Sequence, residues 1–569
     1  MSEGSVTASS SRRLRDRIGD PGGFATVAEL LGWRGPLAGN AGDHARSVAA
    51  RLRADTRVDA VSITDGAGGH ATLSPEVVAG ELLTQGDQVI VHVACRDRNR
   101  NELMSLGWRL QSAGIENVLA ITGDYPQEGP FGLARPVFDI DSVGLLQLYS
   151  ALNSGAIADD VVSRRVPRDR AREFPPLTLA HWGSPPAAAD LYLGAVVNPY
   201  KRVECDLLPQ YLKLELKARA GARYAISQVG FDARRLDELI RYVTDHGLQL
   251  DLLAGVIVLS PRMARILHGG AGIPGVTVTA ELLEFAERQA HSTDKGRAFF
   301  LELAAKQVAV ARGLGYAGAY LSSMARGDDY LRVLDLADTF GADDWRGFTG
   351  DVTWSPPDAY WFYEADPATG LNSSQPTGPG KAGRAPVGYR LSRLAHTIAF
   401  TPGTRGFRAA AGVLRSGERA GLGHALHVAE QAAKIPLYGC RDCGDCSLPE
   451  IAYLCPESRC LKNQRNGPCG GSRDGECEIP GRPCIWASAY QRLRPYGEEL
   501  AMLRRPPTVQ DNALRRTSGW ANYFLGRDHA GRPGPREAAP RTRSPGTAGP
   551  GQTARAANPT GSMPEERAP

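Results

Sequence analysis

The sequence predicts an α/β protein in which a (β/α)8 barrel is followed by a small cysteine-rich metal-binding domain and a disordered C-terminal tail. Three observations predict this order. Between about residues 24 and 323, short apolar segments alternate with longer helical patterns. Eight of the ten cysteines lie between Cys440 and Cys484. The last 40 or so residues are rich in Pro, Gly, Ala and Arg, a composition that cannot bury a core.

Eight apolar segments are expected to form the strands of the barrel. Segment 89–95 is apolar on both faces apart from His92, as expected of a strand in a parallel sheet that is covered on both sides. The predicted strands are residues 24–30, 60–64, 88–95, 117–122, 191–198, 224–231, 250–259 and 316–322. Eight such β/α units within about 300 residues indicate a closed TIM barrel.

These patterns divide the chain into five parts. We expect a flexible N-terminus over residues 1–20, the barrel over 21–345, a linker or irregular region over 346–417, the cysteine-rich domain over 418–525 and the disordered tail over 526–569. Helices are predicted over 102–114, 207–220 and 418–434, and a long loop over 125–142. Loops that follow barrel strands usually carry function.

The composition excludes several classes of protein. Hydrophobic residues make up 42% and charged residues 22% of the 569 residues, an ordinary globular balance. The formal net charge of +4, from 66 basic and 62 acidic residues, is too small to indicate a nucleic-acid-binding protein. No apolar stretch reaches the ~18 residues of a membrane span, and the first residues lack a signal-peptide pattern. We therefore expect a cytoplasmic protein with small-molecule partners and with neither nucleic-acid nor membrane partners.

Polar side chains interrupt the apolar segments near the predicted strand ends, where a barrel places its chemistry. Glu29 is a lone acid at the end of the first strand, suited to act as a general acid or else simply facing solvent. Thr64 and Asp65 end the second strand. His92 lies within the third strand, where a hydrogen-bonded core residue is the competing interpretation.

The fourth predicted strand ends in Thr122, Gly123 and Asp124. A glycine at this position lets the backbone approach a flat ligand, and the acid adds one negative charge at the barrel mouth. The alternative is that Asp124 caps the following turn. Gln228, in the sixth strand, offers an amide that can pair with the edge of a heterocycle, or serves as a buried structural amide.

Residues 20 to 330 resemble methylenetetrahydrofolate reductase, a family of flavoproteins. The resemblance is carried, in chain order, by HVACRDRN at 92–99, GIENVLAITGD at 114–124, the lysine-containing segment 212–222, and Gln228 with the Phe-Asp pair at 231–232. The Thr-Gly-Asp segment at 122–124 is the most specific of these motifs.

The resemblance implies a reaction and a role for each candidate residue. Glu29 is implied as the general acid that opens the folate's five-membered ring, and Asp124 as the residue that stabilises the resulting cation beside the flavin and pterin. Hydride is implied to pass from N5 of FAD to the iminium carbon of the folate. The implied FAD-binding residues are Thr64, Asp65, His92, Thr122, Gly123, Asp124, Asn198 and Lys217, and the implied substrate-binding residues are Gln228 and Asp124. Lys217 has the alternative of facing solvent on its helix.

The chain departs from the family pattern at three single positions and in the segment after Glu29, which lacks the usual aromatic-proline sequence. Gly194 and Asn198 stand where many members have Tyr and His, and Gln210 stands where an acid commonly contacts the flavin. These departures bear on the geometry of the FAD site and on the use of NAD(P)H as the electron donor.

The cysteine spacing predicts a metal centre, because in a reducing cytosol such a cluster binds metal more often than it forms disulfides. Cys440, Cys443 and Cys446, followed by Cys455, have a spacing like that of ferredoxin-type iron–sulfur sites, whereas structural zinc usually draws on paired Cys-x2-Cys motifs. The identity of the metal and the grouping of the ligands stay open. The eight expected ligands are Cys440, Cys443, Cys446, Cys455, Cys460, Cys469, Cys477 and Cys484.

The cysteine-rich region itself resembles the C-terminal domain that accompanies methylenetetrahydrofolate reductases in some bacteria, through segments 440–446, 455–460 and 466–471. The implied function is flavin-dependent interconversion of 5,10-methylenetetrahydrofolate and 5-methyltetrahydrofolate. The electron donor is expected to be NAD(P)H or a ferredoxin-like protein, and a homo-oligomer is a further expectation. The alternative is a non-catalytic zinc-ribbon scaffold or nucleic-acid-binding protein with a degenerate barrel.

Overall fold

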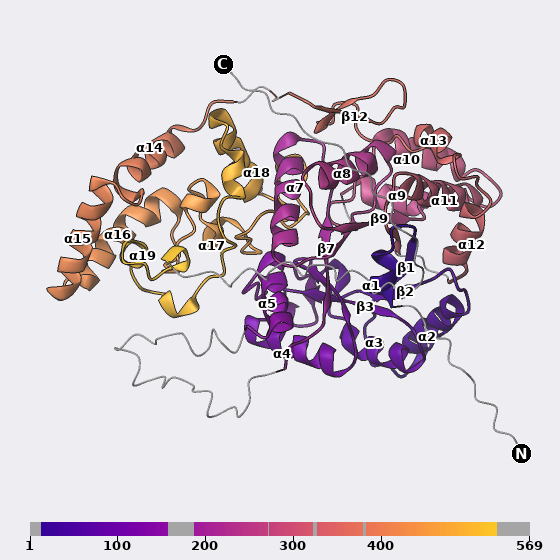
Figure 1. Ribbon diagram of the computed structural model, residues 1–569, viewed down its shortest axis with the longest axis horizontal. Coiled ribbons are helices and arrows are strands. Elements are labelled where there is room, and N and C mark those ends of the chain that lie inside the picture. Colours follow the sequence, from indigo (N-terminus) through magenta and orange to yellow (C-terminus); the bar gives the residue numbers. More distant parts are fainter. Residues whose placement is uncertain are drawn as a thin grey trace, which may run out of the picture. The chain divides into compact units, whose positions relative to one another are not determined.

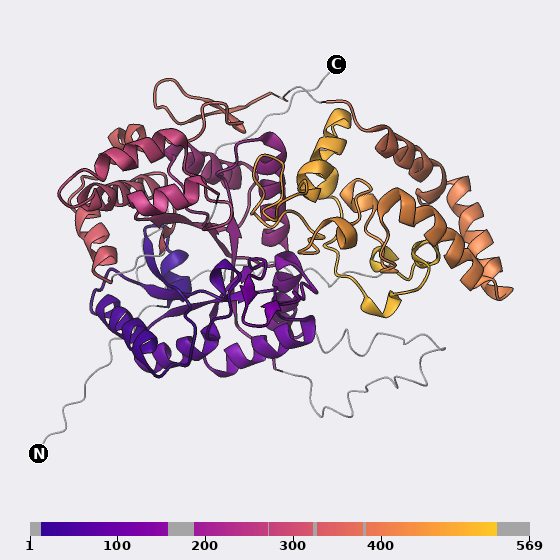
Figure 2. The same ribbon diagram turned by 180° about the vertical axis from the view of Figure 1, so that it is seen from behind.

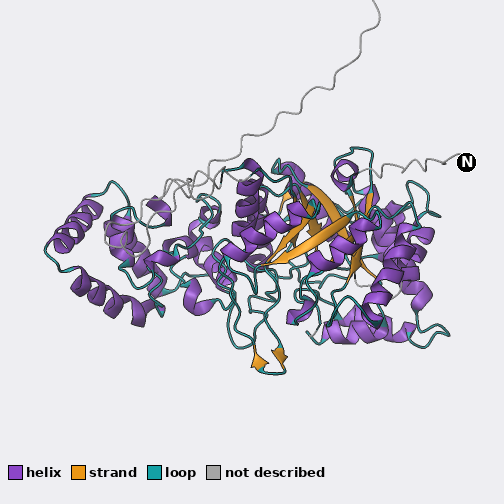
Figure 3. Ribbon diagram, turned by 90° about the horizontal axis from the view of Figure 1, so that it is seen from below, coloured by secondary structure: helices purple, strands orange, loops and turns teal. Residues whose placement is uncertain are grey.

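The computed structural model describes residues 13–156, 187–270, 272–322, 327–378, 380 and 383–531. Eight parallel strands form a closed barrel in the order β1-β10-β9-β8-β7-β4-β3-β2, surrounded by helices (Figures 1 and 3). The strands are β1 (Ala25–Leu30), β2 (Ala60–Ile63), β3 (Val89–Ala94), β4 (Asn117–Ile121), β7 (Tyr192–Val197), β8 (Tyr224–Ser227), β9 (Asp251–Ile257) and β10 (Gly318–Ser322). The TIM barrel and its eight predicted strands are confirmed.

The helices between the strands carry the apolar residues that cover the outside of the barrel. They are α2 (Asn40–Arg53), α3 (Pro75–Thr84), α4 (Arg100–Ser112), α5 (Ser142–Ser154), α7 (Glu204–Arg219), α8 (Ala233–Asp245), α9 (Pro261–His268), α10 (Ala280–Gln289), α11 (Arg297–Gly313) and α12 (Gly327–Ala337). The predicted loop after β4 contains a short hairpin of β5 (Glu128–Gly129) and β6 (Gly132–Leu133).

A short helix closes the amino-terminal end of the barrel. In α1 (Leu14–Ile18), the side chains of Leu14 and Ile18 are buried and join the apolar cluster that fills the barrel interior. The prediction of a flexible N-terminus is therefore wrong for residues 13–20. Leu14 and Ile18 are four residues apart and so share one helix face, a signal too short to recognise in the sequence.

Residues 346–417 are more regular than the predicted linker. They contain the end of α13 (Trp345–Phe348), a two-stranded sheet of β11 (Tyr363–Ala365) and β12 (Asn372–Pro376), and the helices α14 (Val387–Ala395) and α15 (Arg405–Arg419). Ala411 and Leu414 of α15 pack against Ala521 and Phe524. The irregular interpretation is wrong for α14 and α15, because their stability comes from this long-range packing rather than from local composition.

The cysteine-rich region has few regular elements. Its helices are α16 (Gly423–Tyr438), α17 (Pro456–Arg459), α18 (Ile485–Leu493) and α19 (Gly519–Phe524). Helix α18 lies beside α7 of the barrel, as both views show (Figures 1 and 2). No described helix is long and apolar enough to cross a membrane. Most of the predicted tail, residues 532–569, lies outside the described residues.

Candidate functional site

Glu29, at the carboxyl end of β1, is held in place by two hydroxyl groups. Tyr320 Oη donates to Glu29 Oε2 at 2.8 Å, and Ser322 Oγ donates to Glu29 Oε1 at 3.0 Å. Both donors lie on β10, which pairs with β1 in the barrel. Glu29 is nevertheless partly exposed, so its carboxylate has a fixed orientation and an accessible surface.

His92, on β3, is buried inside the barrel and belongs to the same network. Its Nε2 lies 2.9 Å from Ser62 Oγ and 3.2 Å from Tyr320 Oη. Burial lowers the pKa of His92 to about 4 against the opposing charge of Glu29, so the imidazole is neutral near pH 7. His92 is thus a hydrogen-bonded residue of the barrel interior, and its contact with a flavin stays a prediction.

Thr64 and Asp65 bond to neighbouring strand ends. Thr64 Oγ1 accepts a hydrogen bond from Gly32 N at 2.8 Å. Asp65 Oδ2 accepts one from Ala94 N at 2.9 Å and forms an ion pair with Arg98. These bonds give both side chains a structural role at the barrel mouth, whatever else they contact.

Asp124 follows β4 and is also fixed but partly exposed. Its Oδ2 accepts a hydrogen bond from Gly68 N at 2.7 Å. The preceding Gly123 has a φ of +87°, and a Cβ there would lie 3.0 Å from Ala94 Cβ. Glycine is therefore required here by backbone conformation and by packing, independently of any ligand.

Gln228 follows β8 and is the third partly exposed polar side chain at a strand end. Its Nε2 donates to Pro274 O at 3.2 Å, and its Oε1 accepts from Val229 N at 2.9 Å. Because all eight strands are parallel, Glu29, Asp124 and Gln228 lie at the same end of the barrel. That they line a single pocket stays a prediction.

Lys217 and Asn198 already have protein partners. Lys217 Nζ donates to Val196 O at 2.5 Å, and the side chain is buried, so the solvent-facing interpretation is wrong. Burial and the neighbouring Lys213 lower the pKa of Lys217 to about 7. Asn198 Nδ2 donates to Gly275 O at 2.9 Å and to Gly470 O at 3.3 Å.

The structure explains one departure from the family pattern. A Cβ on Gly194 would lie 2.2 Å from the ring of Tyr224 on the next strand. The Tyr224 hydroxyl donates to Val118 O at 3.2 Å. The ring of Tyr224 therefore occupies the space that a side chain at position 194 would take.

Residues 462–475 of the cysteine-rich region, here named the docking loop, contact the barrel at the ends of β4 and β7 and along α7. The hydrogen bonds are Lys462 Nζ to Gly123 O (2.8 Å), Thr122 Oγ1 to Gln464 Oε1 (3.3 Å), Lys213 Nζ to Gln464 Oε1 (2.9 Å), Asn466 N to Asp141 Oδ2 (2.9 Å), Lys201 Nζ to Gly470 O (2.6 Å) and Gly475 N to Asp206 Oδ2 (2.9 Å). Three predicted cofactor contacts, Thr122, Gly123 and Asn198, are engaged by this loop.

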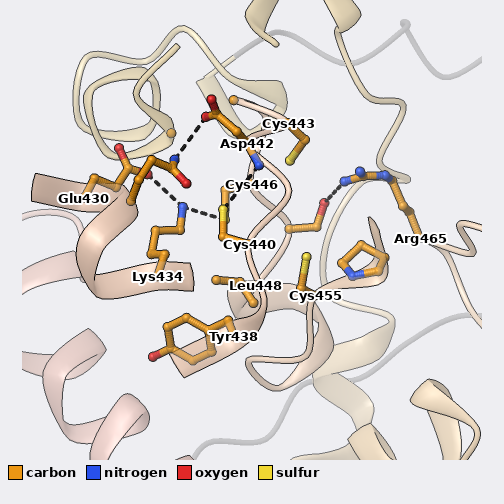
Figure 4. A pocket seen from close by; sticks show the side chains of 15 residues that line it. Glu430, Lys434, Tyr438, Cys440, Asp442, Cys443, Cys446, Leu448, Cys455 and Arg465 are labelled. Atoms are coloured by element: carbon orange, nitrogen blue, oxygen red, sulfur yellow. Dashed lines mark hydrogen bonds and ion pairs between the residues drawn. The ribbon is translucent and has the colours of Figure 1, made fainter. Parts of the chain in front are cut away.

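Four of the eight clustered cysteines line one pocket (Figure 4). This first cysteine group is Cys440, Cys443, Cys446 and Cys455. Burial raises the pKa of Cys440, Cys443 and Cys446, and the Cys455 thiol raises it further in each. The pocket encloses about 380 Å³, including the part open to solvent.

The other four cysteines form the second cysteine group. This group consists of Cys460, Cys469, Cys477 and Cys484. Burial raises the pKa of Cys460, Cys477 and Cys484, and the neighbouring Cys469 raises the pKa of each further, as Cys455 does in the first group. The first four cysteines line one pocket, and the grouping of the eight cysteines into ligand sets stays a prediction.

Buried lysines accompany both groups. The chain has only eight lysines among its 66 basic residues, and five of them, Lys201, Lys213, Lys217, Lys434 and Lys462, are buried. Lys434 Nζ lies 3.4 Å from Cys446 Sγ. Cys469 lies close enough to Lys201, Lys217 and Lys462 to interact with them electrostatically. Because a buried ammonium is costly without an anion nearby, this arrangement fits cysteines that are deprotonated, as metal ligands are.

Among the described residues, one trio of ligand-type side chains has all its ligand atoms within 4.8 Å of one another: Asp445, Asp528 and His529. Cysteine thiolates bind both zinc and iron–sulfur clusters, so which of the two the cysteine groups would hold stays a prediction.

A buried ion network lies next to the first cysteine group. His529 Nδ1 contacts Asp445 Oδ1 at 2.5 Å, and His529 Nε2 lies 3.4 Å from Glu450 Oε1. Burial opposes the charged imidazolium, but the hydrogen bonds to Asp445 and Glu450 outweigh it and raise the pKa of His529 to about 9. The ring is therefore a cation near pH 7.

Sequence reasoning missed Tyr320, Lys462 and Gln464. Tyr320 lies within a predicted strand, but nothing in the sequence distinguishes it from the other tyrosines. Lys462 had a usable signal, because lysine is rare in this arginine-rich chain and a retained lysine marks a place for a compact cation.

Two family models match the chain. Residues 39–155 match the model described as methylenetetrahydrofolate reductase, and residues 420–512 match the model described as methylene-tetrahydrofolate reductase C terminal. The resemblance predicted from the sequence is confirmed in both parts. One match lies within the barrel and the other within the cysteine-rich region, in the order predicted from the sequence.

No curated protein matches the chain significantly. Among solved structures, a protein from Clostridium thermocellum that binds two copies of 5-methyl-5,6,7,8-tetrahydrofolic acid is 12% identical, with a TM-score of 0.38, over 57% of this chain and 98% of its own. A Yersinia pestis DHPS with a pterine-sulfa conjugate is also 12% identical, with a TM-score of 0.30, over 56% of this chain and 95% of its own. At these scores neither likeness supports an inference about function.

Proposed function

We propose that the protein is a flavin-dependent oxidoreductase that interconverts 5,10-methylenetetrahydrofolate and 5-methyltetrahydrofolate. The observation that carries the proposal is the geometry of Glu29, which two β10 hydroxyls fix at the barrel mouth of a chain with a methylenetetrahydrofolate reductase segment. A fixed, accessible carboxylate is what a general acid requires.

The hydrogen-bond network behind Glu29 can accommodate both the ionised and the protonated form of its carboxyl group. Tyr320 Oη lies 2.8 Å from Glu29 Oε2 and 3.2 Å from His92 Nε2. With Glu29 ionised, the hydroxyl donates to the carboxylate. When Glu29 carries a proton for the substrate, the hydroxyl can turn and donate to the neutral His92, so no buried polar group loses its partner.

The polar side chains at the carboxyl end of the barrel suit a flat, polar ligand. Glu29, Asp124 and Gln228 are partly exposed, whereas Thr64, Thr122 and Asn198 are buried and bonded within the protein. A bound FAD would supply the hydride, and Asp124 would hold a negative charge close to the cation that develops on the substrate. Gln228 would orient the pterin through its amide.

The cysteine groups would hold two iron–sulfur clusters in this proposal. The sequence spacing of Cys440, Cys443 and Cys446, followed by Cys455, supports clusters over zinc. Such clusters would let a ferredoxin-like protein donate single electrons, with NAD(P)H as the alternative donor. Zinc in both groups would make the domain a structural brace.

A non-catalytic scaffold is the competing proposal, and one observation favours it. The docking loop engages Thr122, Gly123 and Asn198, three positions expected to contact FAD. A scaffold would be colourless, contain stoichiometric zinc and bind no folate.

Anaerobically purified protein decides between these proposals by its absorbance and metal content, since flavin and iron–sulfur clusters absorb differently and zinc is silent. Asp124→Asn should lower folate turnover by about 100-fold or more while flavin content stays near that of the wild type. Glu128→Gln removes a carboxylate from the exposed hairpin of the same loop and is the matched control. Full turnover in Asp124→Asn would contradict the assignment.

A further inference from the structure

Lys462 is a buried cation from the cysteine-rich region at the mouth of the barrel. Its side chain is only 4% exposed, and its Nζ donates to Gly123 O at 2.8 Å. The same ammonium forms an ion pair with Glu478. One end of this contact therefore lies in the Thr-Gly-Asp segment and the other lies beside the second cysteine group.

The charges around Lys462 explain why an ammonium is stable there. The Glu478 carboxylate pairs with the buried ammonium, and the Gly123 carbonyl accepts its hydrogen bond. The cation thus bridges Glu478, which follows Cys477, and Gly123, which immediately precedes Asp124. Its position follows from hydrogen bonding and charge, and it would be costly if either set of partners were absent.

The docking loop also contacts the Thr-Gly-Asp segment at residues 122–124 through a second residue, Gln464. Gln464 Oε1 accepts hydrogen bonds from Thr122 Oγ1 at 3.3 Å and from Lys213 Nζ at 2.9 Å. Gln464 Nε2 donates to Lys462 O at 2.8 Å, which ties the two loop residues together. Thr122 and Gly123 are therefore both bonded to the cysteine-rich region immediately before Asp124.

We propose that the docking loop is a wall of the barrel's ligand site and that Lys462 is a positioning residue for Thr122, Gly123 and Asp124. The site is then shared between the two regions, and the barrel alone has an incomplete site. This inference deepens the proposed function, on which its catalytic part rests. The positioning itself is a property of the protein that can be measured without turnover.

The test uses the full-length protein and three variants. Lys462→Met removes the cation with little change in length, Lys462→Arg keeps a charge, and Lys295→Met removes an exposed cation outside the docking loop as the control. Hydrogen–deuterium exchange of peptides covering residues 122–126 reports positioning. Folate turnover, split into kcat and KM, together with metal content and flavin absorbance, reports function.

In Lys462→Met we expect exchange over residues 122–126 to accelerate by about 10-fold or more, and kcat to fall by about 10- to 100-fold with KM changing less. Metal content should stay at the wild-type level. Lys462→Arg should restore the protection from exchange and part of kcat, and Lys295→Met should match the wild type in every measurement.

Wild-type exchange over residues 122–126 in Lys462→Met would overturn the inference, and so would loss of metal in that variant, which would make Lys462 a support of the cysteine group. If the wild type itself shows no folate turnover, the proposed function fails. The exchange result then still decides whether the docking loop positions the barrel segment.

Discussion

The two cysteine groups differ in what surrounds them. The pocket of the first group is lined entirely by residues 430–519, with Lys434 and Glu430 as its buried ion pair. The second group has Lys201 and Lys217 of the barrel among its charged neighbours. Two similar sets of four cysteines therefore hold different things together: the first holds the C-terminal region itself, and the second joins that region to the barrel.

Replacing one cysteine in each group should give the largest difference between the two groups in folate turnover and in hydrogen exchange. Cys469→Ser and Cys455→Ser should each lose about half of the bound metal if, as proposed, each group holds its own metal. Only Cys469→Ser should abolish folate turnover and increase exchange over the docking loop, since its group contacts the barrel. Metal analysis and exchange by mass spectrometry measure both effects.

Cys205→Ser is the control for these variants, because Cys205 lies outside both groups and accepts a hydrogen bond from Gln491 that a serine can keep. Equal loss of turnover in Cys455→Ser and Cys469→Ser would remove the distinction between the two groups.

The second largest effect is expected on stability, when the buried ion pair between Lys434 and Glu430 beside the first group is broken. Lys434→Met leaves Glu430 buried without its cation and should lower the free energy of unfolding by about 3–5 kcal/mol. Urea unfolding followed by tryptophan fluorescence measures this loss. Glu430→Gln combined with Lys434→Met should recover part of it, and a double variant as unstable as the single one would show that the charge is not the cause.

Two histidines, His529 in the C-terminal region and His92 in the barrel, should make these regions lose stability at opposite ends of the pH range. The pKa of His529 is raised to about 9, so its stabilisation is complete below about pH 6.5 and is lost as the pH rises through 9. The pKa of His92 is lowered to about 4, so its stabilisation is present above about pH 6.5 and is lost as the pH falls towards 4.

Each effect should be on the order of 3 kcal/mol, because each pKa lies about 2.5 from the ordinary histidine value and a difference of one in pKa corresponds to about 1.36 kcal/mol. Calorimetry between pH 4 and pH 10 should show the C-terminal region destabilised in alkali and the barrel in acid. His529→Gln should remove only the loss of stability at alkaline pH. If that loss is unchanged in the variant, a group other than His529 causes it.

The smallest loss of stability is expected at Lys217. Its pKa of about 7 shows that its charge is disfavoured where it lies, so Lys217→Met should not lower the free energy of unfolding and should raise it at pH 6, where the wild-type ammonium is charged. Thermal unfolding at pH 6 and pH 8 measures the change. A large fall in flavin content of Lys217→Met would instead make this residue a cofactor contact.

The barrel could be predicted from the sequence because strands such as β3 are buried on both faces and read as continuous apolar segments. The shared end of Glu29, Asp124 and Gln228 followed from the same topology, since parallel strands bring their carboxyl ends together. The contacts of Lys462 with Gly123 could not be predicted, because the two residues are 339 positions apart and docking leaves no periodic pattern.

The helix α1 adds a constraint on where the barrel can bind a ligand. Leu14 and Ile18 cover the amino-terminal end, and the apolar side chains behind them fill the interior. A small molecule that the barrel recognises would therefore have to approach from the carboxyl ends of the strands, on the side of the docking loop.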